Sequence, residues 1–140
     1  MADPSPADPQ PQTLWMLWIA LFASVLIYAA LGVYGPLKRE PGDPELLRTM
    51  TQVIGVIALA NVGAVFGLRG VLAKTLPYQA YCLVRWALCE SVAVFGLVLF
   101  FMGAALEVLG AFCAVAMFAM VLARPSAGDK EAYDEEKKSA

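Results

Sequence analysis

The sequence predicts an all-α membrane protein, an integral membrane bundle of four transmembrane helices. Of its 140 residues, 60% are hydrophobic and only 16% are charged, whereas soluble domains are about 45–50% apolar and about 25% charged. The mean hydropathy is +0.66. The apolar residues form continuous runs of roughly 20 residues, the length that a helix needs to cross a hydrocarbon core. Helices are favoured over strands because the runs do not alternate, and because a helix satisfies its own backbone in lipid.

The N-terminal segment differs sharply from these runs. Residues 1–12 contain four prolines and two aspartates, and we expect this segment to be a disordered tail. It has no Lys or Arg and therefore lacks the basic region of a signal peptide. The apolar run that follows is long enough to remain in the membrane as the first span.

The first span is expected over about residues 13–34. Trp15 and Trp18 lie near its start, and Tyr28 and Tyr34 lie toward its end. Tryptophan and tyrosine are enriched where a helix meets the membrane–water interfaces, and we assign these four rings to the two interfaces. A glycine–proline pair then ends the helix, because proline cannot continue it smoothly.

Three further spans follow. A polar connection that contains prolines precedes the second span, which is expected over about 49–68. The third and fourth spans are expected over about 81–102 and 105–123. Only Gly103 and a few neighbours separate them, which predicts a tight antiparallel hairpin. The charged segment 124–140 is expected to be a disordered tail.

The distribution of Lys and Arg predicts the orientation, since cytoplasmic loops carry an excess of these residues. An even number of spans places both tails and the second connection on one side. That side would hold Arg69, Lys74, Arg85, Arg124, Lys130, Lys137 and Lys138, and the opposite side Lys38, Arg39 and Arg48. We therefore expect both termini in the cytoplasm of a protein of the bacterial inner membrane. Arg85 is expected to extend its charged end to the nearby interface.

Several function classes are disfavoured by the residues themselves. The net charge of -2 gives no basic field for nucleic acid. There is no histidine, the commonest general base near neutral pH. Cys82, Cys89 and Cys113 lie in apolar stretches and are expected to be packing residues. No nucleophile-plus-base arrangement, glycine-rich phosphate loop or metal-ligand cluster is apparent, so we expect neither an enzyme nor a cofactor.

Glu90 is the most informative residue, because it lies near the middle of the third span. A charge at that depth costs about 2.5–3.5 kcal/mol or more, and burial penalises the charged form. We therefore expect Glu90 to be protonated or paired with a cation. Arg85 is five residues earlier, about 140° around the helix, which makes a direct pair poor. The alternative is a static carboxyl that is hydrogen-bonded to a neighbouring helix.

Two other polar residues are expected at the depth of Glu90. Asn61 lies in the middle of the second span, and an antiparallel hairpin would place it at a similar depth to Glu90. Ser91 adds a hydroxyl directly after Glu90. Carboxylate, amide and hydroxyl oxygens together suit a hard cation such as Na⁺. The same groups suit a protonated carboxyl held by hydrogen bonds, and the sequence leaves both possibilities open.

The second span also contains small residues four positions apart. These pairs are Ala60 with Ala64 and Gly63 with Gly67. Small residues at this spacing let membrane helices approach closely. The pattern predicts either packing of like hairpins in an oligomer or packing against helices of the same chain.

The third span resembles a known membrane helix. Residues 85–98 (RWALCESVAVFGLV) resemble the second helix of the ring-forming c subunit, or proteolipid, of rotary ATP synthases. In that family an essential carboxyl is followed six residues later by a glycine in an aromatic-Gly-Leu-Val stretch, as Glu90 is by Gly96 here. The Ser91 that follows Glu90 resembles the sodium-binding members. The resemblance covers about residues 49–102 and implies reversible binding of H⁺ or Na⁺ at Glu90, with Gly96 in helix packing.

These observations combine into one functional hypothesis and two rivals. The leading hypothesis is a c-subunit-like protein that binds H⁺ or Na⁺ at Glu90, assisted by Asn61 and Ser91, in a homo-oligomer or with other membrane subunits. Because two further spans flank the hairpin, the chain is proteolipid-like rather than a standard subunit. The first rival is a structural or accessory membrane subunit in which Glu90 is a packing residue. The second, a small solute transporter, lacks the inverted repeats and broken helices typical of that class.

Overall fold

The computed structural model describes residues 11–35 and 42–138, and these ranges are helical apart from short connections. The helices are α1 (Pro11–Tyr34), α2 (Pro44–Gly67), α3 (Arg69–Thr75), α4 (Tyr78–Phe101), α5 (Leu106–Leu122) and α6 (Ala127–Lys138). Over these residues the prediction of an all-α fold is confirmed. The helices α1, α2 and α4 are long and apolar enough to cross a membrane. The shorter α5 meets the same criterion only together with α6, from which it is bent by 73°.

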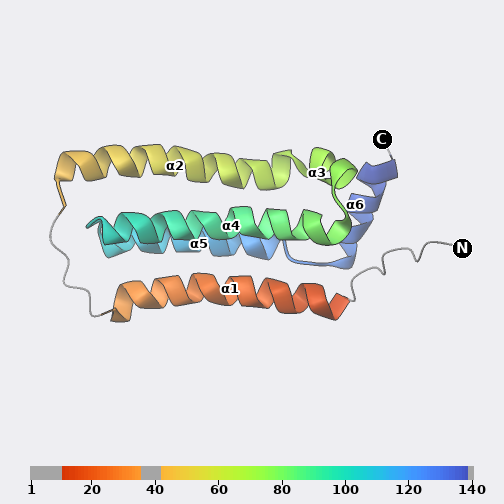
Figure 1. Ribbon diagram of the computed structural model, residues 1–140, viewed down its shortest axis with the longest axis horizontal. Helices are drawn as coiled ribbons and strands as arrows, with labels where there is room; N and C mark the ends of the chain where they lie inside the picture. The colour runs from red at the N-terminus through yellow and green to blue at the C-terminus, as the bar shows by residue number, and fades with distance from the viewer. Residues whose placement is uncertain (1–10, 36–41, 139–140) are drawn as a thin grey trace, which may run out of the picture.

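The helix α4 is the centre of the arrangement. It packs against α1, α2 and α5, and α1 also packs against α5. Figure 1 shows α1 and α2 on opposite sides of the α4–α5 pair. Accordingly, 44% of the apolar window of α4 is buried, against 6% for α1 and 11% for α2. Most of the surface of α1 and α2 is therefore apolar and exposed.

Local sequence explains where α2 begins and how α4 joins α5. The structure starts α2 at Pro44, earlier than the predicted 49, because the Asp43 carboxylate accepts a hydrogen bond from Glu45 N at 3.0 Å and proline suits the first helical turn. At the other turn, Gly103 has a φ of 102°, a conformation that glycine adopts without a steric penalty. The Ala104 N–H then donates to the Leu99 carbonyl at 2.9 Å. This closes the predicted α4–α5 hairpin.

The structure differs from the prediction at the C-terminal segment. Residues 124–140 were expected to be disordered, but α6 occupies 127–138 and packs against α3. The reason is that Asp129, Tyr133 and Glu136 are spaced four and three residues apart, which places them on one face of the helix. Tyr133 is 4% exposed, and its hydroxyl donates to the Leu76 carbonyl at 3.0 Å. The predicted N-terminal tail lies outside the described residues except for its last two positions.

Candidate functional site

Glu90 lies in the middle of α4 and points toward α1. Its Oε1 lies 2.5 Å from the Ser24 hydroxyl oxygen and accepts a hydrogen bond from the Tyr28 hydroxyl at 3.0 Å. Ser24 and Tyr28 are four residues apart, so the same face of α1 presents both hydroxyls. The Ser24 oxygen also lies 2.6 Å from the carbonyl oxygen of Leu21 in the preceding turn. The carboxyl is thus held between two helices by polar groups of the same chain.

The structure places the other two predicted site residues on a different side of α4. The Asn61 amide donates to the Ser91 hydroxyl at 2.8 Å, and that hydroxyl donates to the Leu88 carbonyl at 2.8 Å. Consecutive residues of a helix are about 100° apart, so Glu90 faces α1 while Ser91 faces α2. Asn61 does reach the expected depth. Its contact is with Ser91, however, rather than with the carboxyl.

A second polar cluster lies at the end of the bundle where α3, α4 and α6 meet. The Arg85 side chain is 1% exposed, and its Nη1 donates to Asp129 Oδ1 at 2.7 Å. Arg85 also donates to the Tyr81 hydroxyl at 3.0 Å and to the Val65 carbonyl at 3.2 Å. Arg85 was expected to extend its charged end to the nearby interface, and the structure buries that end inside the protein. A carboxylate carried by α6 reaches in to pair with it.

Arg69 completes this cluster from α3. It donates through Nη2 to Asp129 Oδ1 and through Nε to the Tyr81 hydroxyl, both at 3.4 Å. The hydrogen bond to Tyr81 raises the pKa of the Arg69 guanidinium above its usual value. Arg69 is therefore charged at every physiological pH. Two guanidinium groups thus converge on one carboxylate oxygen. We call Arg69, Tyr81, Arg85 and Asp129 the end cluster.

The predicted small-residue positions divide into two groups. At Gly63 and Gly67, an added Cβ would meet nothing within 4 Å. Ala60 is exposed and Ala64 is half-buried. At Gly96, by contrast, an added Cβ would lie 2.5 Å from Phe112 Cβ, so the α4–α5 contact requires glycine there. The Gly63–Gly67 face of α2 is left open by the described part of the chain.

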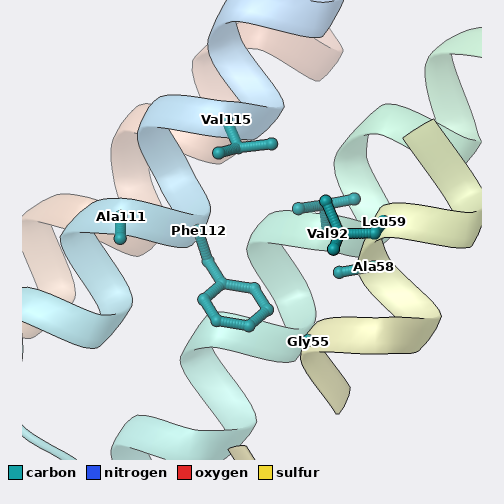
Figure 2. Close-up of a pocket in the computed structure, with 7 residues that line it drawn as sticks. All are labelled: Gly55, Ala58, Leu59, Val92, Ala111, Phe112 and Val115. Atoms are coloured by element: carbon teal, nitrogen blue, oxygen red, sulfur yellow. The ribbon is translucent and has the colours of Figure 1, made fainter. Parts of the chain in front are cut away.

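A groove of about 220 Å³ opens between α2 and α5 over the central α4. Figure 2 shows its lining, which consists of Gly55, Ala58, Leu59, Val92, Ala111, Phe112 and Val115. All of these side chains are apolar and lack a hydrogen-bonding or charged group. The groove therefore has no polar chemistry with which to orient a substrate.

Comparisons of the chain with models of protein families, with curated proteins and with solved structures give no match. The proteolipid resemblance therefore rests only on the residues quoted for it. Sequence reasoning missed Ser24 and Tyr28 as partners of Glu90, and Asp129 as the partner of Arg85. The available signals were a serine and a tyrosine on one face of an apolar helix, and a buried arginine that needed an acid. The three cysteines are free and buried.

Proposed function

We propose that the chain is an integral membrane protein of the bacterial inner membrane that crosses it four times and holds an exchangeable proton on Glu90. In this proposal α5 is the fourth span, and the Lys and Arg bias places both termini in the cytoplasm. The length and apolar composition of α1, α2 and α4 support placement in a membrane. The hydrogen bonds of Glu90 support the choice of a proton.

A count of hydrogens at Glu90 carries this proposal. Three short oxygen–oxygen contacts run from the Leu21 carbonyl to Ser24, from Ser24 to Glu90 and from Glu90 to Tyr28. Ser24 and Tyr28 supply only two hydroxyl hydrogens for them. All three contacts become hydrogen bonds when the carboxyl of Glu90 supplies the third, by donating to Ser24 while Ser24 donates to Leu21. A neutral carboxyl also avoids the large cost of a charge at mid-membrane.

The same geometry favours H⁺ over Na⁺. Hard cations in proteins are held by several oxygen ligands. Around Glu90, the Ser24 hydroxyl is already shared with Leu21, and the Asn61–Ser91 pair lies on the α2 side of α4. The oxygens nearest to the carboxyl therefore suit a proton and its hydrogen bonds. Exchange of that proton with either side of the membrane requires a further component, such as a second copy or another membrane subunit.

One observation favours the structural rival. Both hydroxyls that bind Glu90 come from α1 of the same chain, which is what a carboxyl that fastens α1 to α4 would show. In that function the proton is permanent, and the protein serves as a membrane scaffold or accessory subunit. A carbodiimide test separates the two functions, because the reagent modifies protonated carboxyls that it can reach.

The experiment is carbodiimide labelling of the purified protein in detergent, read site by site by mass spectrometry across pH, with and without Na⁺. Glu107 is exposed at the start of α5 and serves as the control carboxyl. Labelling of Glu90 that persists to neutral pH, after labelling of Glu107 has stopped, supports an exchangeable proton. Protection of Glu90 from labelling by Na⁺ would identify the bound cation as Na⁺ instead of H⁺. No reaction at Glu90 while Glu107 reacts would contradict an exchangeable proton and favour the scaffold function.

A further inference from the structure

The end cluster has the composition of an anion-binding site. Arg85 is buried in α4, a helix that is apolar enough to span a membrane, and a buried guanidinium needs an anion as its partner. Arg69 joins from α3 with 36% of its side chain exposed, which provides a route to solvent. Arginine is the residue best suited to bind carboxylate and phosphate groups, because its fork of donors can engage two oxygens.

Asp129 occupies this site, but the hydrogen-bonding capacity of its carboxylate and of the Tyr81 hydroxyl is only partly used. Both arginines contact the same oxygen, Oδ1. The other oxygen, Oδ2, is buried and has no hydrogen-bond partner among the described residues. The hydroxyl of Tyr81 accepts from Arg69 and Arg85, so its own hydrogen remains to be donated. An anion with more oxygens than a single carboxylate would engage this set of donors more fully.

The helix that carries Asp129 buries little apolar surface. Tyr133 is the one residue of α6 in the apolar core, and its ring packs with Tyr78 and Tyr81 at centroid distances of 5.1 and 5.2 Å. Glu136 also approaches α3 closely at Gly70. An element with so little buried apolar surface belongs to the least stable part of a fold and opens before the rest. Asp129 is therefore a ligand that can leave without unfolding the bundle.

We propose that Arg69, Tyr81 and Arg85 form a binding site for a phosphate group, and that Asp129 of α6 occupies this site as an internal competitor. Phosphate binding then displaces α6 from α3. The phosphate belongs either to an anionic lipid headgroup or to a free ion. The site lies at the end of the spans, within reach of lipid headgroups. Basic pockets between helices on the cytoplasmic side of a membrane bind such headgroups. The proposal is independent of the proton on Glu90.

The test measures amide hydrogen exchange in residues 127–138 of the full-length protein by mass spectrometry. The protein is compared in phosphatidylcholine vesicles and in vesicles that also contain phosphatidylglycerol. The expected result is a severalfold faster exchange of α6 with phosphatidylglycerol. In detergent, sodium phosphate is compared with sodium chloride at equal ionic strength. A response to both probes identifies phosphate itself as sufficient, and a response to the vesicles alone identifies the headgroup.

Two variants separate this site from general attraction of basic residues to anionic lipid. Arg69→Gln is expected to lose the response to phosphatidylglycerol, while Lys74→Gln, which removes an exposed charge of α3 outside the end cluster, is expected to keep it. Equal exchange in the two vesicle types together with no effect of phosphate overturns the proposal. A response to phosphatidylglycerol that persists in Arg69→Gln also overturns the proposal. Asp129→Asn is expected to exchange fast in both vesicle types, and Glu90→Gln is expected to respond as the unchanged protein does.

Discussion

Substitution of Asp129 by alanine tests the structure most directly, because it leaves Arg85 without its charged partner. Arg85 is 1% exposed and Asp129 is 8% exposed, and they are joined at 2.7 Å. Removal of one member of such a buried pair costs about 3–5 kcal/mol. Arg85 keeps its bonds to Tyr81 and Val65, which favours the lower end, about 3 kcal/mol. Arg69 is half-exposed at 3.4 Å and adds less than about 1 kcal/mol.

The compensating experiment removes both charges. In Asp129→Ala with Arg85→Met, the buried guanidinium is replaced by an apolar side chain that fills similar space, and such replacements are neutral or stabilising by about 1–4 kcal/mol. We therefore expect the double variant to recover most of the loss. The measurement is reversible unfolding in mixed micelles, followed by circular dichroism. A loss in Asp129→Ala within about 0.5 kcal/mol, as for a surface substitution, would refute the pairing, as would a double variant that is no better than the single one.

Three further outcomes follow from individual contacts and are measured by the same unfolding assay. Gly96→Ala is expected to cost about 1–3 kcal/mol, since its Cβ would overlap a side chain of α5; an unchanged midpoint would contradict the close α4–α5 packing. Gly63→Ala is expected to stabilise the isolated chain by about 0.5–1 kcal/mol, because the added methyl group meets no other atom. Light scattering shows whether the same substitution dissociates an oligomer. Tyr28→Phe is expected to cost about 0.5–1.5 kcal/mol through the lost bond to Glu90, whereas Tyr34→Phe, at an 84% exposed site, changes nothing; equal losses would contradict the contact.

The sequence was a good guide to the fold because the dominant signal is length and continuity of apolar runs. Each of these runs corresponds to a long helix, and Gly103 marks the hairpin between the last two. Glu90 could be singled out because a carboxyl at mid-membrane is costly wherever it points. Its direction could not be predicted, because apolar helices carry little information about which face meets which neighbour. Tyr28 was assigned to the interface because tyrosine is enriched there, and its contact with Glu90 could not be foreseen.

The end cluster shows a different limit of sequence reasoning. The segment 124–140 is so polar that composition alone predicts disorder, since a chain with few apolar residues cannot bury enough surface to offset its conformational entropy. What orders α6 is a small number of specific contacts, chiefly those of Asp129 and Tyr133. The spacing of those two residues was visible, but its meaning depends on an arginine that lies more than 40 residues earlier in the chain.

The placement of α1 has a consequence for how the protein is made. The helix α1 is synthesised before α4 and α5, on which it packs: Ser24 meets Glu90, and the Trp18 indole donates to the Met120 carbonyl at 3.1 Å. During synthesis, α1 therefore lacks these contacts until α4 and α5 have also been made. In a nascent chain that stops before α5, α1 would remain unattached.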